Sequence, residues 1–589
     1  AVDTIIAGAV FGEVSLIYDV PRTATIRATQ PSRCWAVHRH LFQTTLQESA
    51  VDGRRQVYSF LRSIELFAKL PSREISRIAD VVEQESFPAG ATIIKQGDVG
   101  GSMYVIQLGK AIVSVAQDRG NSEGKGAEEE DSILKRILNE GDYFGERSLL
   151  LEEPRSATVT AASDVAALRI DSDAFKQLLG SLHEYLTQRL PKDKEAESGV
   201  SPSDKRRNIQ SSDKARSQHV AFSDLVPLKM LGKGGYGRVV MVRRESNRRL
   251  YALKLISKET LMASNVAKRV AWIMREKEVL AELDHPFIVR MYETYSNANW
   301  VYMLLSIALG GDMYRLIEKL GSLSENVARF YIGSLVLALQ HLQELDVVYR
   351  DLKPENVLLD SQGYVKLCDF GFAKILMEDR TYSRCGTPDY TSPEMLLNSG
   401  VNQACDWWAL GVVTCELLTG MPPFSDPDGD DMVTYKNILR GDVLWESDLN
   451  QCVKPKAKKL ISELLTVKVA YRLGYLRGGA SEVLKHDWFD GFDWDALVNL
   501  SMASPWRPQL KKADDASCFD ESVGGDASII MDKEPPSYAP ELEAQWETLQ
   551  LAFKAKGRVR PARMSQELPL VACASPSCSR PPASEPSVP

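Results

Sequence analysis

The stretch FGERSLLLEEPRSATV, residues 144–159, repeats in register an earlier stretch, FGEVSLIYDVPRTATI, residues 11–26. Each copy separates a glutamate and an arginine by nine positions: Glu13 with Arg22, and Glu146 with Arg155. One such pair would be ordinary on a surface, where an exposed ion pair contributes only about 0–1 kcal/mol to stability. Because the surrounding glycine and proline recur as well, the repeat indicates two copies of one ligand-binding unit.

Short β-branched runs precede the second copy. Residues 87–116 alternate these runs with glycines, a pattern typical of strands joined by tight turns, and they predict a small β-roll. The acidic, glycine-bearing residues 117–131 are expected to form a solvated loop. Residues 171–190 begin with Asp and Ser and space their apolar residues as a helix does, so a helix is expected to close the roll. Residues 40–47 end the first copy in a similar way.

The composition is that of an ordinary globular protein of several domains. The chain has 589 residues, 44% hydrophobic and 25% charged, and no apolar run approaches the about 20 residues of a membrane-spanning helix. The net charge of -8 argues against a nucleic-acid partner. Nine cysteines without a C-x-x-C pair, and no leader peptide, favour reduced thiols and a cytoplasmic location. Because the chain starts at Ala1, just before the first motif, we expect a fragment of a longer protein.

The repeated residues suit a cyclic phosphate diester that carries a ribose hydroxyl. The planar guanidinium of Arg155 can face the phosphate oxygens, and backbone N–H groups after Gly145 supply further donors at the start of a helix. Glu146 can accept the hydrogen bond of the ribose 2′-hydroxyl, while Gly145 lets the backbone approach the ligand. Pro154 stiffens the backbone before Arg155. The sequence thus predicts a cyclic-nucleotide site.

These stretches resemble the cyclic-nucleotide-binding domains of cyclic-nucleotide-regulated kinases. In that family the residue after the arginine is Ala at sites that prefer cAMP, and Thr or Ser at sites that prefer cGMP. The resemblance therefore implies cGMP as allosteric activator, since a hydroxyl can accept a hydrogen bond from the guanine 2-amino group, worth about 0.5–1.5 kcal/mol. The cyclic-nucleotide-binding residues expected on this basis are Gly12, Glu13, Arg22, Thr23, Gly145, Glu146, Arg155 and Ser156. Because most of the first β-roll would lie before Ala1, the second site is expected to bind better.

A second set of motifs begins near residue 231. Gly232, Gly234 and Gly237 form G-x-G-x-x-G, a motif that alone also fits dinucleotide-binding folds. Lys254 follows in an aliphatic strand, which suits a β-hairpin lid over phosphates with a cation beneath it. The ATP-binding residues expected here are Gly232, Lys233, Gly234, Gly235, Tyr236, Gly237, Val239, Lys254 and Leu305.

An ordered set of catalytic motifs continues this half. Glu276 lies in an expected helix and can keep Lys254 charged and directed at the α- and β-phosphates of ATP. YRDLKPEN at 349–356, DFG at 369–371 and SPE at 392–394 then follow in the order of the protein-kinase signature. The expected catalytic residues are Asp351, Lys353, Lys254 and Glu276, and the expected metal ligands are Asn356 and Asp369.

Each of these residues has an electrostatic task in phosphoryl transfer. Asp351 would accept the hydroxyl proton of the incoming Ser or Thr, and Lys353 would neutralise charge on the γ-phosphoryl group. Asn356 and Asp369 offer hard oxygen ligands to two Mg²⁺ ions. An inactive pseudokinase would lack Lys254, Asp351 or Asp369, and none of them is missing.

This half resembles AGC-type kinase catalytic domains on DFGFAK, CGTPDY, DWWALGV and PPF, and both halves together resemble the cGMP-dependent protein kinase family. The resemblance implies phosphorylation of Thr381 in the activation loop, with the phosphate docked on Arg350 and Lys374. It also implies a buried ion pair between Glu394 and Arg472. Protein substrates would carry basic residues upstream of the target Ser or Thr, received by Asp312, Glu355 and Glu416.

Some positions depart from the family pattern. Ser306 follows Leu305 where an acidic residue is usual, and Trp272 stands where the family's helix has His, so a phosphate on Thr381 would lack that contact. In the tail, the resemblance suggests that Phe519 caps the nucleotide cleft and that Phe553 docks on the small lobe.

These patterns predict a multidomain α+β chain in which β-roll cyclic-nucleotide-binding domains precede a bilobal kinase domain. The expected parts are the end of a first cyclic-nucleotide-binding domain (1–50), a complete second one (51–190), a linker (191–220), the kinase domain (221–490), an AGC-type tail (491–553) and a disordered end (554–589). The basic stretch 205–212 of the linker either mimics a substrate or is a plain exposed linker.

The sequence therefore favours a cGMP-activated serine/threonine kinase that uses ATP and Mg²⁺. Two alternatives stay open. One is a cAMP-dependent kinase of the same architecture, and the other is a cyclic-nucleotide sensor with an inactive kinase scaffold. The oligomeric state does not follow from the sequence.

Overall fold

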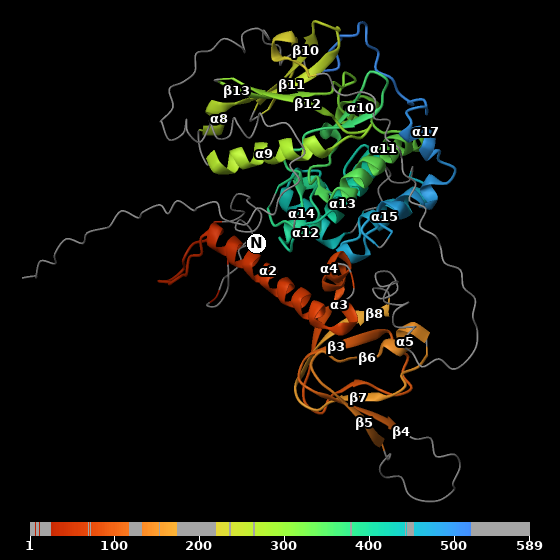
Figure 1. Ribbon diagram of the computed structural model, residues 1–589. Coiled ribbons are helices and arrows are strands. Elements are labelled where there is room, and N and C mark those ends of the chain that lie inside the picture. The colour runs from red at the N-terminus through yellow and green to blue at the C-terminus, as the bar shows by residue number, and fades with distance from the viewer. Residues whose placement is uncertain are drawn as a thin grey trace, which may run out of the picture. The chain divides into compact units, whose positions relative to one another are not determined.

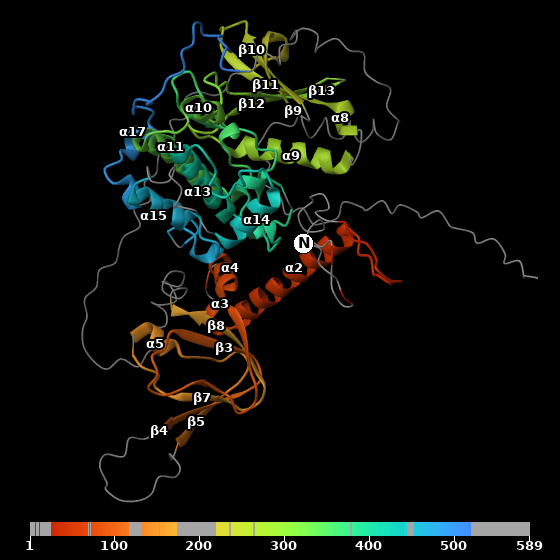
Figure 2. The same cartoon turned by 180° about the vertical axis from the view of Figure 1, so that it is seen from behind.

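The computed structural model describes residues 6, 11 and 25–519, except 69, 71, 117–131, 152, 173–218, 235–236, 263–265, 298, 377–379, 384, 442, 444–452 and 477. These residues form a β-rich domain preceded by helices and a larger domain with a sheet and many helices, seen from two sides in Figures 1 and 2. The predicted mixed α+β architecture is confirmed. The expected first-copy site, loop 117–131 and most of the helix at 171–190 lie outside the described residues.

Three helices open the described chain: α2 (Arg39–Ser63), α3 (Glu65–Ala68) and α4 (Ser72–Val81). The helix α2 runs without a break through residue 50, where the sequence suggested a change of domain. The apolar side chains of α3 and α4, such as Phe67 and Ile78, are fully buried against strand residues such as Val105. This burial attaches the helices to the β-roll that follows.

The β-roll consists of two antiparallel four-stranded sheets, ordered β1-β8-β3-β6 and β2-β7-β4-β5. Its elements are β1 (Glu83–Phe87), β2 (Thr92–Ile94), β3 (Ser102–Leu108), β4 (Ala111–Ala116), β5 (Ser132–Leu138), β6 (Tyr143–Phe144), α5 (Glu146–Leu151), β7 (Thr158–Ala161) and β8 (Val165–Asp171). Side chains of both sheets, including Ile106 and Val159, form one buried core. The helix α5 starts directly after Gly145, so the roll delivers the repeated motif to a strand-to-helix turn.

The larger domain begins with a five-stranded antiparallel sheet of order β12-β13-β11-β10-β9. Its elements are β9 (Leu225–Gly234), β10 (Gly237–Arg244), β11 (Leu250–Ser257), α8 (Lys258–Met262), α9 (Val266–Glu282), β12 (Met291–Ser296) and β13 (Trp300–Leu305). The central strand β11 is buried along most of its length, which its nearly unbroken apolar sequence requires. Figures 1 and 2 both show α9 lying along this sheet.

The rest of the domain is mainly helical. Its helices are α10 (Met313–Leu320), α11 (Glu325–Glu344), α12 (Pro393–Leu396), α13 (Ala404–Thr419), α14 (Asp431–Arg440), α15 (Pro455–Leu464), α16 (Ala480–Leu484) and α17 (Trp494–Val498), and its strand pairs are β14 (Val347–Val348) with β17 (Lys374–Ile375) and β15 (Val357–Leu359) with β16 (Val365–Leu367). Every residue of α13 from Ala404 to Leu418 is buried, and apart from Asp406, Thr414 and Glu416 these residues are apolar or small, as expected of a central helix. It packs against α11 and α15 and forms the centre of this region.

A buried ion pair braces the helical region. Arg472, which is fully buried, donates hydrogen bonds from Nη1 and Nη2 to the two carboxylate oxygens of Glu394, at 2.7 and 2.9 Å. Burial opposes the charged form of Glu394, but Arg472 outweighs this effect and lowers the pKa of the carboxyl group. The predicted pair is therefore confirmed.

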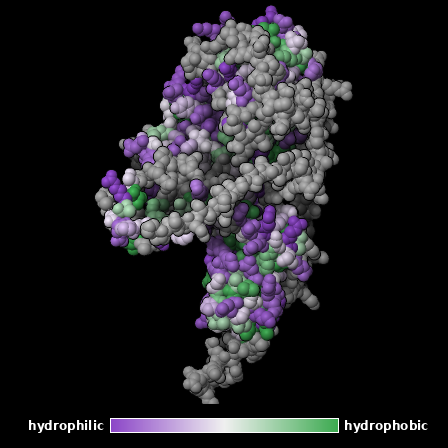
Figure 3. All heavy atoms as spheres, turned by 90° about the vertical axis from the view of Figure 1, so that its left-hand side faces the viewer, coloured by the Kyte–Doolittle hydropathy of each residue, from purple (hydrophilic) through white to green (hydrophobic). Residues whose placement is uncertain are grey.

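The described surface is of the ordinary globular kind. Figure 3 shows hydrophilic and hydrophobic side chains interspersed on one face. Among the described residues, no helix has both the length and the apolar content needed to cross a membrane.

Candidate functional site

Arg155 is the centre of the candidate site in the β-roll. Its side chain is almost fully buried, and its guanidinium donates to the carbonyl of Gly145 at 2.9 Å, to Ser148 Oγ at 2.7 Å and to the carbonyl of Ser102 at 2.5 Å. These acceptors come from β3 and from the turn into α5. Its hydrogen bonds within the described part of the chain thus go to neutral groups that fix the guanidinium, while the charges of Glu146 and Asp98 act on it electrostatically.

Two glycines leave the space that Arg155 fills. Gly145 has a φ of +85°, and a Cβ there would lie 2.5 Å from Arg155 Nη1. A Cβ on Gly100 would lie 2.7 Å from Arg155 Cζ and 2.2 Å from Ser148 Oγ. The sequence pattern predicted a role for Gly145 but not for Gly100 and Ser148, because these two depend on a contact between a loop and the distant helix α5.

Glu146 and Ser156 complete the predicted residues of the second copy. Burial raises the pKa of Glu146, and the nearby charges of Arg147 and Arg155 oppose this shift. Ser156 is exposed and directly follows Arg155. The site thus combines a fixed guanidinium, a half-buried carboxyl group and an exposed hydroxyl. The corresponding residues Gly12, Glu13, Arg22 and Thr23 lie outside the described part of the chain.

In the larger domain, Lys254 joins two carboxylates. Its Nζ lies 2.6 Å from Glu276 Oε1 on α9 and 3.4 Å from Asp369 Oδ1. Burial favours the neutral lysine, but the two carboxylates outweigh burial and hold the pKa of Lys254 above its usual range. Burial raises the pKa of Glu276, while the charge of Lys254 lowers the pKa of Asp369. The ammonium group is thus held between a helix and the loop that carries Asp369.

The glycine motif occupies the turn between β9 and β10. Gly232 pairs with Val239, and Val239 pairs in turn with Lys254 on β11. A Cβ on Gly237 would lie 2.2 Å from the carbonyl oxygen of Leu255, so the close approach of these strands requires glycine. Gly235 and Tyr236, between these strands in the sequence, are outside the described residues.

An apolar cluster lies beside this hairpin. Val239, Leu305 and the tail residue Phe519 pack against a group that includes Leu231 and Ala252. These side chains suit the flat apolar faces of an adenine base. Phe519 packs with this cluster, and its predicted role as a cap of the nucleotide cleft stays a prediction, whereas Phe553 is not among the described residues.

The loop after β14 carries the candidate catalytic residues. Asp351 is buried, and burial raises the pKa of its carboxyl group. Asn356 Nδ2 donates to Asp351 Oδ2 and to the Asp351 carbonyl, both at 2.7 Å. Lys353 Nζ lies 3.4 Å from Asp351 Oδ2 and donates to Thr387 Oγ1 at 2.7 Å. The structure thus brings these three predicted residues together and adds Thr387, which the sequence analysis missed.

Asp406 on α13 holds the backbone of this loop. Its carboxylate accepts the backbone N–H groups of Tyr349 at 2.9 Å and of Arg350 at 2.7 Å. Arg350 has a φ of 69°, an unfavourable backbone conformation for a residue with a side chain. Burial raises the pKa of Asp406 to about 6. The motif DWWALGV contains this residue, but its spacing gave no sign of the contact.

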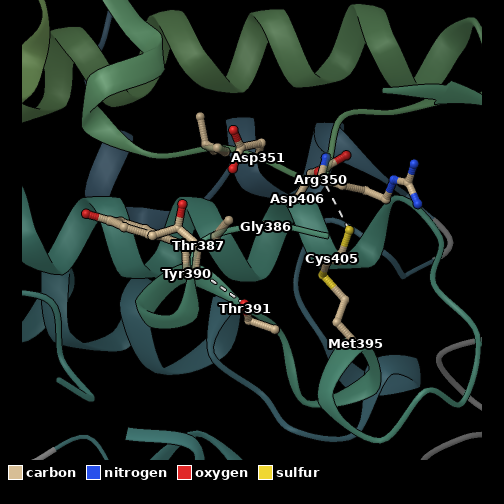
Figure 4. Close-up of a pocket in the computed structure, with 11 residues that line it drawn as sticks. Arg350, Asp351, Gly386, Thr387, Tyr390, Thr391, Met395, Cys405 and Asp406 are labelled. Atoms are coloured by element: carbon tan, nitrogen blue, oxygen red, sulfur yellow. Dashed lines mark hydrogen bonds between the residues drawn. The ribbon is translucent and has the colours of Figure 1, made fainter. Parts of the chain in front are cut away.

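A pocket lies next to Asp351, and Figure 4 shows its lining. Thr387 and Tyr390 are on one side, and Met395 and Cys405 are on another. The pocket is therefore formed by the catalytic loop, by the segment before α12 and by α13.

In the activation segment, Lys374 and Arg350 contact two different hydroxyl groups. Lys374 Nζ lies 3.2 Å from Thr381 Oγ1, whereas Arg350 Nη1 donates to Ser383 Oγ at 2.7 Å. The two hydroxyl oxygens are 3.4 Å apart. Only 3% of Thr381 is exposed, and its backbone pairs with Val401. The expected docking of a phosphate on Thr381 against both cations stays a prediction. The sequence pattern did not indicate the contact of Ser383 with Arg350.

The three acidic residues expected to bind substrate differ in their surroundings. Glu416 is buried and accepts a hydrogen bond from the Tyr390 hydroxyl at 2.8 Å. Burial raises its pKa to about 7, and the charges of Glu355 and Asp389 add to the shift. Glu355 is exposed. Asp312 instead caps α10, where it accepts the backbone N–H of Arg315 at 2.9 Å.

Two family models match the chain in three segments. Residues 225–489 match the family described as Protein kinase domain, and residues 1–49 and 84–181 match the family described as Cyclic nucleotide-binding domain. Both matches agree with the two groups of residues described above.

Curated relatives cover most of the chain. It is 36% identical over 522 residues to a cGMP-dependent protein kinase isozyme 2 of Drosophila melanogaster, a match covering 88% of this chain and 53% of the relative. It is 36% identical to cGMP-dependent protein kinase egl-4 of Caenorhabditis briggsae and 35% identical to human cGMP-dependent protein kinase 2, with 87% of this chain and 67% of each relative covered. The chain therefore spans about half the length of the Drosophila relative and two thirds of the other two.

Proposed function

Because this chain belongs to the cGMP-dependent protein kinase family, we propose that it is a cGMP-activated serine/threonine kinase that transfers the γ-phosphoryl group of ATP. The observation that carries this proposal is a pair of side-chain clusters: Lys254 contacts Glu276 and Asp369 in one, and Asn356 contacts Asp351 in the other. Catalysis of phosphoryl transfer consists mainly of positioning and electrostatic stabilisation, and a rigid set of charges suits both tasks.

Each of these residues has a role in the proposed reaction. Lys254 binds the α- and β-phosphates, and the ion pair with Glu276 keeps its ammonium group in place. Asp351 receives the proton of the substrate hydroxyl, and the hydrogen bond from Asn356 fixes the orientation of its carboxylate. Lys353, which already contacts Asp351 and Thr387, stabilises charge on the transferred group.

Mg²⁺ bound with ATP belongs to the proposal, and the residues present fit it. Asp369 has a lowered pKa, and 52% of its side chain is exposed, so an ionised carboxylate is accessible. Asn356 uses its amide nitrogen on Asp351, which leaves the amide oxygen for a metal ion. Oxygen ligands of this kind suit Mg²⁺, which would neutralise charge on the phosphates.

The activation segment offers a place for a regulatory phosphate, which we assign to Thr381. A phosphate there would contact Lys374 first, and the Ser383 hydroxyl on Arg350 is only 3.4 Å from the Thr381 hydroxyl. The cation pair thus supports a phosphate at this end of the segment. Identification of the phosphorylated residue by mass spectrometry tests the assignment directly.

For protein substrates we propose basic residues upstream of the target Ser or Thr. The charge of Glu355 adds to the raised pKa of Glu416, and a substrate arginine beside Glu416 would favour its ionised form. Asp312 is included in the proposal, although a substrate arginine would compete there with Arg315.

For the activator we propose cGMP, bound at Gly145, Glu146, Arg155 and Ser156. The guanidinium of Arg155 is held by backbone carbonyls and a hydroxyl, so it is oriented before any phosphate arrives. The exposed hydroxyl of Ser156 is available to a guanine 2-amino group.

One experiment separates the three candidate functions. Phosphorylation of an arginine-rich peptide is measured with Mg–ATP and with cGMP, cAMP or neither nucleotide. The proposal predicts activity that rises at lower concentrations of cGMP than of cAMP. A stronger response to cAMP would identify a cAMP-dependent kinase, and cGMP binding without any phosphate transfer would identify a sensor with an inactive kinase domain.

A further inference from the structure

The helix α9 contacts the DFG segment through an indole as well as through an ion pair. Trp272 and Glu276 are four residues apart on α9, so they lie on one face of the helix, one turn apart. A Cβ built on Gly371 would lie 2.6 Å from Cζ2 of Trp272 and 3.2 Å from its Nε1. The indole therefore lies directly against the glycine and leaves no room for a side chain there.

The ion pair reaches the same segment by a longer route. Glu276 contacts Lys254, and Lys254 contacts Asp369, which is two residues before Gly371. The Lys254–Asp369 distance of 3.4 Å is longer than the Lys254–Glu276 distance of 2.6 Å. Trp272 therefore contacts the segment directly at Gly371, whereas Glu276 acts on it through Lys254.

The conformation of Asp369 needs such support. Its φ of 52° is unfavourable for a residue with a side chain, and about half of its side chain is exposed, so burial alone does not fix it. A shift of α9 away from the segment would lengthen the contact of Lys254 with Glu276, and the ammonium group would then be less firmly held beside Asp369. The packing of the indole on Gly371 opposes that shift, because moving α9 away would separate the two groups and lose their van der Waals contact.

We propose that Trp272 is a positioning residue for phosphoryl transfer, which holds α9 against Gly371 so that Glu276, Lys254 and Asp369 keep their arrangement. This inference rests on the proposed kinase function. Trp272 does not touch the reacting atoms, and its effect passes through Gly371 and Asp369. An apolar contact of this kind does not depend on a phosphate in the activation segment.

The test is a pair of reciprocal substitutions. Gly371→Ala places a methyl group inside the indole, and kcat for an arginine-rich peptide is expected to fall about tenfold or more, equivalent to about 1.4 kcal/mol in the barrier. Trp272→Leu removes the wedge and should lower kcat by a similar factor, with KM for the peptide changed less than about twofold. In the double variant Gly371→Ala/Trp272→Ala the clash is absent, so kcat should exceed that of Gly371→Ala alone.

Trp300→Leu is the matched control, because it removes an indole from the same sheet domain, away from Gly371. The Tm of this variant shows how much stability the domain loses when an indole is removed elsewhere. Its kcat should stay within about twofold of the wild-type value. A Trp272→Leu variant with wild-type kcat would overturn the inference. So would a double variant no more active than Gly371→Ala.

A wild-type chain without phosphoryl transfer would refute the proposed function instead. In that case the rise in Tm that Mg–ATP produces is measured for both single-tryptophan variants, because Lys254 and Asp369 both contribute to the binding of Mg–ATP. A smaller rise in Trp272→Leu than in Trp300→Leu supports the positioning role, and equal rises contradict it.

Discussion

At Gly145, one backbone angle decides whether the guanidinium of Arg155 has room. Its φ of +85° is strained for any residue with a Cβ, and that Cβ would also lie 2.5 Å from Arg155 Nη1. Gly90 has the same φ of +85° but nothing within 4 Å of a Cβ. Alanine at Gly90 would cause backbone strain alone, whereas alanine at Gly145 would cause the same strain and also displace Arg155.

We expect Gly145→Ala to weaken cGMP binding by about tenfold or more, because the methyl group displaces the guanidinium that faces the phosphate. Gly90→Ala should lose a comparable amount of stability, about 1–2 kcal/mol, without losing affinity. Calorimetric titration with cGMP and thermal unfolding of both variants provide the two measurements. Equal affinities of the two variants would show that Arg155 is not displaced.

Glu416 makes substrate binding depend on pH. Its pKa of about 7 lies above the ordinary value of 4.5, so near neutral pH part of the folded protein carries a protonated carboxyl group. Only the ionised form pairs with a substrate arginine, and KM for an arginine-rich peptide should therefore fall as the pH rises from about 6 to about 8. The pKa of Glu416 is higher in the folded protein than its ordinary value of 4.5. The contribution of Glu416 to the free energy of unfolding therefore decreases as the pH rises from about 4.5 to about 7.

The Glu416→Gln variant serves as the control for this titration. Its KM should be higher and nearly independent of pH, because the amide does not ionise. Steady-state kinetics at several pH values check both expectations. If the variant retains the pH dependence of the wild type, another group is responsible.

At the scale of elements, sequence patterns predict contacts between residues of one motif or of neighbouring strands, and they do not predict contacts between distant segments. The pairing of β10 with β11 sets Val239 opposite Lys254. The glycine motif and the aliphatic strand around Lys254 had already indicated a β-hairpin that covers phosphates, with a cation beneath it. The contacts of Asp406 with the backbone of Tyr349 and Arg350 were not predictable, because they join positions more than fifty residues apart. The packing of Trp272 on Gly371 was likewise hidden, since the sequence marks only a missing histidine.

The link between α13 and the catalytic loop leads to a prediction about Asp406. Its two carboxylate oxygens accept two backbone N–H groups and keep Arg350 in a strained conformation beside Asp351. In Asp406→Asn one acceptor becomes a donor, so one buried N–H loses its partner. We expect kcat to fall about tenfold or more, with a smaller change in KM for ATP.

Asp430→Asn is a suitable control for that substitution. Asp430 caps α14 through a hydrogen bond from the Met432 backbone N–H, a role that asparagine fills equally well. Kinetics and circular dichroism of both variants distinguish a catalytic effect from loss of folding. A normal kcat for Asp406→Asn would mean that the loop keeps its conformation without this carboxylate.

At the scale of the whole molecule, the proposal requires that nucleotide binding in one domain change catalysis in the other. A ligand shifts such an equilibrium only if it binds the two states with different affinities. Allosteric coupling between sites is typically about 1–3 kcal/mol, or about 5–150-fold in affinity. The β-roll and the kinase domain can each be disabled separately, which allows the coupling to be measured.

We expect Arg155→Ala to abolish the stimulation by cGMP, so that the ratio of activities with and without cGMP approaches one, because the cyclic phosphate loses its charged partner. Asp369→Ala should have the opposite pattern: peptide phosphorylation falls by several orders of magnitude, since the proposed metal ligand is gone, while cGMP still binds. Kinase assays and calorimetric titrations on both variants provide a complete two-by-two comparison. The proposed coupling fails if cGMP stimulates Arg155→Ala as strongly as the wild type at every concentration, since activation would then not pass through this site.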